Sequence, residues 1–254
     1  MSDLQVERRS SQTWMTITRE ARRNALNDEV LRGMLTVLTS PGDTRVVLVD
    51  SVGPVFCSGA DLVQMSPGSS GLAVHEARGL LREVVLAMQA CPVPVVAVVQ
   101  GACLAGGLGL VLGCDIVLAA GDAEFGLPEV DLGLWPFMVS ALLGRHVSPK
   151  QAMELMLTGR RVRADEALTL GLVSRVVDGS DLTQEAQSLA AVLAAKPPAA
   201  VRLGKAAFQT AMESPLPAAL AAMQAQLSLL AMSDDAAEGV AAFLEKRPPH
   251  WTGH

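Results

Sequence analysis

PVPVVAVVQGACLAGGLGLVLGCD, spanning Pro92–Asp115, joins a run of buried-strand residues to a glycine-rich helical segment. Glycine at such a turn lets backbone N–H groups at the helix N-terminus approach a ligand, with the positive end of the helix dipole behind them. The segment therefore predicts either an oxyanion or anion site or a tight packing turn. Gly107, Gly109 and Gly113 also form a loose G-x-G-x-x-x-G pattern, which keeps a nicotinamide-dependent enzyme as an alternative. We expect these glycines to lie inside the helix, which weakens that alternative.

Strand and helix patterns alternate on both sides of this segment. Residues 4–19 alternate between apolar and polar around Ser10 and Ser11, which predicts a hairpin. Residues 24–38 have apolar positions at helical spacing, with Asn27 as the expected N-cap. The further expected elements are a buried strand at 46–50, a helix through 75–90, a strand at 93–100, a helix near 106–113 and a strand at 115–120. This order predicts an α/β protein with a mostly parallel sheet.

The last third of the chain has a different pattern. From Pro149 onward the strand signals fade, and segments rich in Ala, Leu and Met at helical spacing dominate to Lys246. Helices with this much apolar surface pack on their own core or on a partner subunit. We expect the final RPPHWTGH (residues 247–254) to be frayed.

Composition and charge exclude several classes of protein. The 254 residues carry a formal net charge of −6, so no broad basic face is expected for nucleic acid. No apolar run reaches the roughly 20 residues of a membrane-spanning helix, and the N-terminus lacks the apolar core of a signal peptide. We therefore expect a soluble, cytoplasmic protein that contacts no membrane. The four cysteines, Cys57, Cys91, Cys103 and Cys114, lack metal-ligand spacing, so we expect buried free thiols and no structural metal.

Two further segments carry candidate chemistry. VFCSGAD (Val55–Asp61) follows a buried strand and has a glycine where the chain must turn. Such a loop can supply a second backbone N–H, so that two loops meeting at the carboxyl edge of a sheet form an oxyanion hole. The plainer interpretation is a β-turn with Asp61 as a helix cap. Glu129 has apolar neighbours, which predicts a desolvated carboxylate with a raised pKa that moves protons near neutral pH. Its alternative is a solvated helix cap.

These segments, in this order, resemble the enoyl-CoA hydratase/isomerase (crotonase) superfamily. The likeness extends over nearly the whole chain. The matching motifs are RNALN (23–27), FCSGADL (56–62), GACLAGG (101–107), CD (114–115), FGLPEV (125–130), LGL (132–134), TGR (158–160), ADEALTLGLV (164–173) and FLEKR (243–247).

The resemblance implies a spiral of ββα units, here residues 1–195, followed by a helical trimerisation region at 196–254. It implies acyl-CoA thioesters as substrates, a role in fatty-acid metabolism, no cofactor apart from the coenzyme A of the substrate, and self-association as a homotrimer or a dimer of trimers. The N–H groups of Ser58 and Gly106 are expected to hold the thioester oxygen. The residues expected along the coenzyme A are Arg23, Ala60, Asp61, Leu62, Phe243 and Lys246.

The chain departs from the family pattern at one catalytic position. Hydratases of this family use two glutamates, and this sequence matches the second with Glu129 but has Gly109 at the first. The loop after Glu129 is the bulky Trp135–Ser140 instead of a glycine-rich stretch. Hydration needs a positioned, deprotonated water, whereas moving a double bond needs one base. The departure favours enoyl-CoA isomerase chemistry, with hydratase activity, thioester hydrolysis, C–C cleavage and a catalytically idle acyl-CoA binder as alternatives.

Overall fold

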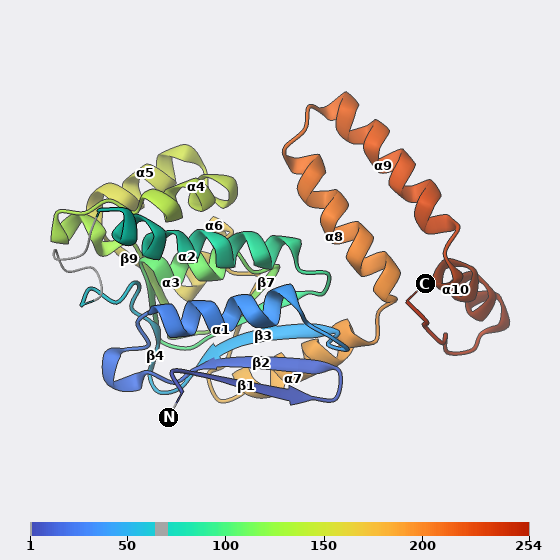
Figure 1. Cartoon of the computed structure of the whole chain (residues 1–254), viewed down its shortest axis with the longest axis horizontal. Helices are drawn as coiled ribbons and strands as arrows, with labels where there is room; N and C mark the ends of the chain where they lie inside the picture. The colour runs from blue at the N-terminus through green and yellow to red at the C-terminus, as the bar shows by residue number, and fades with distance from the viewer. Residues whose placement is uncertain (1, 64–70, 254) are drawn as a thin grey trace.

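Two sheets and the helices around them make up the computed structural model, which describes residues 2–63 and 71–253 (Figure 1). The larger sheet has six strands in the order β1-β2-β3-β5-β7-β10, and the smaller has four in the order β4-β6-β8-β9. One edge pair in each sheet is antiparallel, β1–β2 and β8–β9, and the other neighbours are parallel. The strand bounds are β1 Leu4–Arg9, β2 Gln12–Ile17, β3 Val46–Ser51, β4 Val55–Cys57, β5 Val95–Val99, β6 Ala102–Leu104, β7 Ile116–Ala120, β8 Glu124–Gly126, β9 Arg161–Arg163 and β10 Arg175–Val177.

The helices lie between and around these strands. Their bounds are η1 Glu20–Arg22, α1 Asp28–Thr39, α2 Gly71–Ala90, α3 Gly106–Leu112, η2 Pro128–Leu132, α4 Phe137–His146, α5 Pro149–Thr158, α6 Ala164–Leu170, α7 Leu182–Ala194, α8 Pro198–Met212, α9 Leu216–Ala231 and α10 Asp234–Glu245, where η marks a 3-10 helix. The predicted α/β organisation and mostly parallel sheet are confirmed.

Strand β3 shows how the larger sheet is buried on both faces. Val46 and Leu48 belong to a cluster that includes the buried face of α7, whereas Val47 and Val49 belong to the main core with α1 and α2. Successive side chains of a strand point to opposite faces. A continuous run of apolar residues therefore places apolar side chains in both clusters.

Helix α1 forms as its sequence predicts. The Asn27 side chain accepts a hydrogen bond from the Val30 N–H at 3.0 Å and so caps the first turn. The helix buries one stripe, consisting of Val30, Leu31, Met34, Val37 and Leu38. The predicted hairpin is also confirmed, with its turn at Ser10 and Ser11.

The chain end departs from the sequence prediction. Residues near the C-terminus are anchored rather than frayed, since the Asp235 carboxylate accepts hydrogen bonds from the N–H groups of Thr252 at 2.7 Å and Gly253 at 3.0 Å. The Trp251 indole N–H also donates to the Ala195 carbonyl at 2.9 Å. The four strands of the smaller sheet and β10 were not predicted either, because three residues each are too few to show an alternating pattern.

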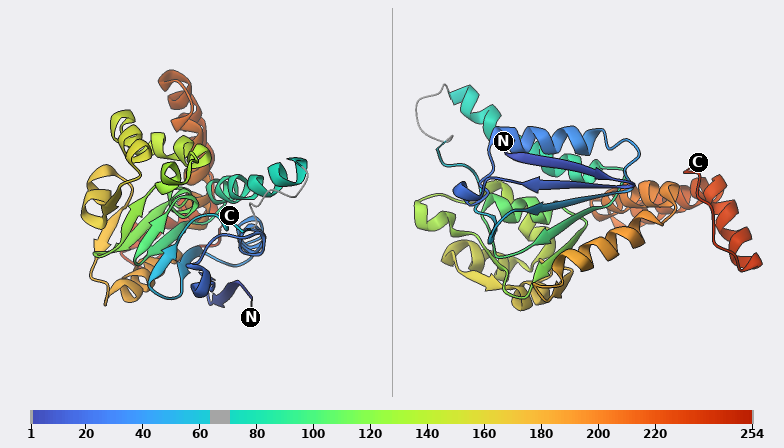
Figure 2. Two further views of the ribbon diagram at one scale, coloured as in Figure 1. Left: turned by 90° about the vertical axis from the view of Figure 1, so that its left-hand side faces the viewer. Right: turned by 90° about the horizontal axis from the view of Figure 1, so that it is seen from below.

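Helices α8 to α10 form an arm that extends away from the sheets (Figures 1 and 2). The arm exposes large apolar side chains, among them Leu227, Met232, Val240, Phe243 and Leu244. In the described residues no single helix is long and apolar enough to cross a membrane, although α9 and α10 pass that test as a pair bent by 71°.

One buried cation connects this arm to the core. Lys205 on α8 lies 2.7 Å from the Asp115 carboxylate and donates to the carbonyls of Met88 at 2.8 Å and Val93 at 3.2 Å. Its side chain is only 10% exposed. A second pair, Arg145–Glu213 at 3.0 Å, also joins α8 to the core but is exposed at both ends.

We predict that Lys205→Met lowers the free energy of unfolding by about 1–3 kcal/mol, because it leaves the Asp115 carboxylate and two carbonyls without their cation. The matched control is Arg145→Met, which removes the exposed pair and should cost less than about 1 kcal/mol. Urea denaturation of both variants measures the difference, and equal losses would contradict the assignment of Lys205 as the anchor.

Candidate active site

Three neighbouring parallel strands of the smaller sheet end at one edge. β4, β6 and β8 lie side by side in that order. Ser58 follows β4 directly, Gly106 comes shortly after β6, and Glu129 comes shortly after β8. The carboxyl edge of parallel strands is where α/β proteins gather their functional groups. The structure therefore brings the three predicted catalytic segments to one place.

The loops after β4 and β6 touch each other through positions that lack side chains. Gly59 has φ +104°, and a Cβ there would lie 2.7 Å from the Ala105 Cβ. A Cβ at Gly106 would lie 3.5 Å from the Ala60 nitrogen. Ala105 itself has φ +52°, and its N–H donates to the Gly126 carbonyl at 2.9 Å, which ties the strained residue to β8. Strain and close contact together hold the backbones of Ala60 and Gly106 next to each other.

The hydrogen bonds of these loops correct one predicted role. The Ser58 N–H donates to the Arg23 carbonyl at 3.1 Å, so it is already used within the fold. The N–H groups of Ala60 and Gly106 have no acceptor within the described part of the chain. Ala60, which sequence analysis placed only in the coenzyme A loop, is therefore the better candidate for the second oxyanion donor. The sequence held no signal for this exchange, because Ser58 and Arg23 are far apart in the chain.

Glu129 lies at the start of η2, behind Pro128. Its Oε2 atom is buried and has no hydrogen-bond partner among the described residues. Burial raises the pKa of Glu129, and a backbone hydrogen bond offsets only part of that effect. The neighbouring carboxylates differ, since Glu124 pairs with Arg161 at 3.0 Å and Asp131 is exposed. Glu129 therefore binds its proton more tightly than an exposed glutamate does.

Comparisons with known proteins agree with this geometry. The sequence model of the family described as Enoyl-CoA hydratase/isomerase matches residues 7–254. The chain belongs to the enoyl-CoA hydratase/isomerase family. It is 36% identical to the 2,3-dehydroadipyl-CoA hydratase of Escherichia coli, over 100% of both chains. It is 35% identical to the mitochondrial enoyl-CoA hydratase domain-containing protein 3 of Rattus norvegicus, over 94% of this chain and 80% of that one.

The fold comparison is equally close. The crystal structure of an enoyl-CoA hydratase from Mycobacterium smegmatis matches with a TM-score of 0.94 at 34% identity, covering 98% of each chain. The crotonase-like α/β fold that the motifs implied is therefore confirmed, and with it membership in a family of lyases and isomerases. The glycines of the loose dinucleotide pattern lie inside α3 and just after it, as expected.

The residues expected along the coenzyme A fall into two groups. Arg23 lies beside the site, because its carbonyl holds the loop after β4. The Asp61 carboxylate binds the Arg19 guanidinium at 2.8 Å. Burial would raise the pKa of Asp61, but its hydrogen bonds to Arg19 and the Val63 N–H lower it below its ordinary value. Leu62 is exposed next to this pair.

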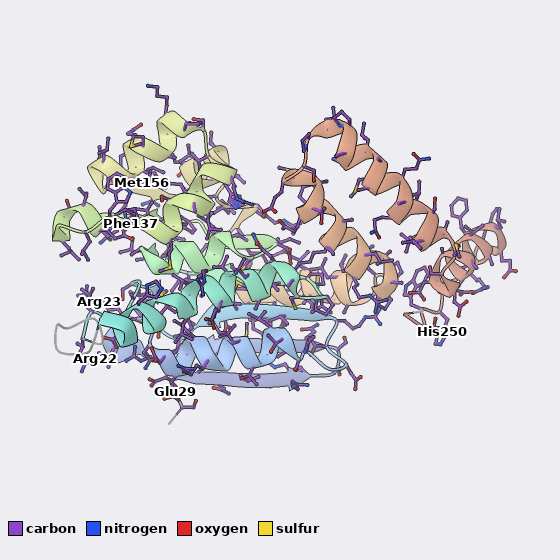
Figure 3. The ribbon with its side chains drawn as sticks, turned by 45° about the horizontal axis from the view of Figure 1, so that its top comes forward. Arg22, Arg23, Glu29, Phe137, Met156 and His250 are labelled. Carbon is purple, nitrogen blue, oxygen red and sulfur yellow. The ribbon has the colours of Figure 1, made fainter. Side chains whose placement is uncertain are left out.

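Phe243 and Lys246 form the second group, which this chain does not bring to its own site. Both lie at the end of α10 and are exposed. Figure 3 shows Arg22, Arg23 and Phe137 at one end of the molecule and His250, close to the end of the arm, at the other. Within one chain these two residues therefore lie apart from the other four, and their expected place along the coenzyme A stays a prediction.

The cysteines are not candidate nucleophiles. Burial raises the pKa of Cys57 to about 12 and raises the pKa of Cys103 and Cys114 as well. The predicted free thiols are confirmed, with Cys114 only partly buried. In residues 2–63 and 71–253, no group of three or more His, Cys, Asp and Glu side chains is placed to hold a metal ion.

We predict that Gly107→Ala disrupts the donor loops. A Cβ at this position would lie 2.8 Å from the Cys57 Cβ and 2.9 Å from the Cys57 carbonyl oxygen, so the loops must separate. The expected cost is about 1–3 kcal/mol of unfolding free energy, with loss of turnover. The matched control is Gly144→Ala in α4, where a Cβ meets nothing within 4 Å and stability should hold or rise. Thermal unfolding and activity assays compare the two; equal behaviour would contradict the packing argument.

A pH-dependent stability difference is expected at Glu129. Because its pKa is raised in the fold above the ordinary 4.5, the folded protein binds this proton more tightly than the unfolded chain does. Stability is then lost as the pH rises through the folded pKa. The neutral Glu129→Gln variant should melt at a higher temperature than the wild type near about pH 8, and the difference should vanish at about pH 4. A difference that grows toward acid pH would contradict the raised pKa.

Proposed function

We propose that Glu129 moves a proton between carbon atoms of an enoyl-CoA thioester whose carbonyl oxygen is held by the N–H groups of Ala60 and Gly106. The observation that carries the proposal is the buried, unpartnered Glu129 Oε2 at the same sheet edge as two free backbone donors. Donors aimed at a developing enolate oxygen are worth roughly 3–4 kcal/mol each at the transition state.

The reaction needs one base and no cofactor. Glu129 takes a proton from C2 of a 3-enoyl thioester, and the electron pair forms an enolate conjugated with the C3–C4 double bond. The protonated Glu129 then returns the proton to C4, which leaves the double bond between C2 and C3. No atom is gained or lost. A raised pKa suits this role, because the group must both accept and release a proton near neutral pH.

Water addition is the second candidate, and the names of the relatives favour it. The Escherichia coli relative is a 2,3-dehydroadipyl-CoA hydratase, and the matching Mycobacterium smegmatis structure is an enoyl-CoA hydratase. Against it stands Gly109, which supplies no carboxylate to a water facing Glu129. We place isomerisation first for this reason.

Coenzyme A binding follows from the same geometry. Arg23 and the loop Ala60–Leu62 adjoin the two donors, so we propose that the pantetheine and nucleotide lie along them. Phe243 and Lys246 cannot reach this site within one chain, so we assign them to the site of another copy in a homo-oligomer. The exposed apolar faces of the arm support this association. A cytoplasmic location remains a prediction.

The decisive experiment mixes the protein with a trans-3-enoyl-CoA in heavy water and follows the acyl protons by NMR. Accumulation of the conjugated 2-enoyl-CoA without 3-hydroxyacyl-CoA is the expected result. Hydroxyacyl-CoA as the main product would establish water addition instead, and release of free coenzyme A would establish a thioester hydrolase. An unchanged spectrum with ligand bound would identify an idle binder.

Glu129→Gln tests the proton carrier. We predict that turnover falls by at least about a hundredfold, because general acid–base catalysis is lost, while acyl-CoA affinity measured by calorimetry stays unchanged. The matched control is Asp131→Asn, which neutralises an exposed carboxylate two residues further on and should keep its activity. Retained turnover in Glu129→Gln would place the proton carrier elsewhere.

A further inference from the structure

Helices α3 and α4 meet where Gly109 faces Val139. Gly109 comes three residues after Gly106, so it lies on the same face of α3 as the residue that offers its N–H. A Cβ at Gly109 would lie 3.0 Å from Val139 Cγ2 and 3.8 Å from Leu81 Cδ2. Leu81 Cδ2 also lies 3.5 Å from the Cβ position of Gly106. The first atom of a side chain at position 109 would therefore meet hydrocarbon, and Val139 would have to shift to admit it.

The sequence after Glu129 places Val139 there. Helix α4 begins at Phe137, and the Ser140 N–H closes its first turn on the Pro136 carbonyl at 2.7 Å. In that turn Phe137 is 77% exposed and Met138 is 42% exposed, whereas Val139 is only 4% exposed. The first turn thus points Val139 alone of these three inward onto α3.

We propose that Val139 is a specificity-determining residue. Its side chain covers Gly109 and keeps water, and any polar group that could activate water, away from this side of the site. A buried water needs two to four polar partners, and the isopropyl group of Val139 and the side chain of Leu81 offer none. A carboxylate forced between them would be desolvated without compensation. Glu129 then meets substrate carbon and no water on this side. This inference rests on the proposed function, because it takes Glu129 as the acid/base.

The contact itself is tested without any activity measurement. Gly109→Ala should lower the melting temperature in the wild-type background, since Val139 must give way. The same change in a Val139→Ala background should leave the melting temperature unchanged or raise it. The matched background is Val147→Ala, which removes the same atoms from an equally buried valine just beyond the other end of α4 and should give no rescue. Equal effects in the two backgrounds would overturn the proposed contact.

The effect on reaction type is tested with Gly109→Glu. Alone it should give no gain in hydration, because the glutamate cannot enter the site. Combined with Val139→Ala, it should raise the ratio of 3-hydroxyacyl-CoA to conjugated 2-enoyl-CoA at least tenfold over the wild type. Hydration by Gly109→Glu alone, equal to that of the double variant, would overturn the role of Val139, as would a folded, active double variant with an unchanged ratio.

These outcomes are separable from failure of the proposed function. Glu129→Gln is made in the wild-type and double-variant backgrounds. Turnover that survives in both would refute the acid/base role of Glu129 itself. Suppose instead that Glu129→Gln abolishes turnover in both backgrounds, while the double variant that retains Glu129 keeps the wild-type product ratio. That result would support the proposed function and refute only the role of Val139.

Discussion

The close approach of two backbone loops is the constraint on which the rest of the site depends. Gly59 and Ala105 touch, with Gly107 against Cys57 directly behind them, and no additional side-chain atom fits between these segments. The contact exists because β4 and β6 are neighbouring parallel strands whose chains turn at the same edge. Without it, the backbones of Ala60 and Gly106 would not lie next to each other.

Charge pairing distinguishes Glu129 from three other carboxylates of the chain. Asp61 has Arg19, Glu124 has Arg161, and Asp115 has Lys205. Each of these carboxylates holds two parts of the chain together. The Oε2 atom of Glu129 makes no hydrogen bond with the described residues. The free-energy cost of removing it from water is therefore not offset by a contact that stabilises the fold. Asp50 Oδ1 on β3 is also buried without a partner in the described part of the chain, so it is the position of Glu129, after β8 at the edge where β4 and β6 end, that points to function.

Much of this arrangement could be predicted from sequence because its causes are local. The Asn27 cap and the doubly buried β3 each follow from residues a few positions apart. The exchange of Ser58 for Ala60 could not be predicted, since it depends on a hydrogen bond to the carbonyl of Arg23, far away in the chain. Two other features also depend on residues far apart in the chain and could not be predicted. They are the anchoring of the C-terminus by Asp235 and the contact of Val139 with Gly109.

Cys57 gives the constraint an experimental consequence of a different kind. Its sulfur lies 2.9 Å from the Cβ position of Gly107 and accepts a hydrogen bond from the Gly59 N–H at 3.4 Å, so it is enclosed by both donor loops. With its pKa raised to about 12, the thiol is unreactive while the loops stay together. The rate at which a disulfide reagent modifies Cys57 therefore measures how often this part of the protein opens. Cys57 is thus a natural probe of the motion of the two loops whose close contact defines the site.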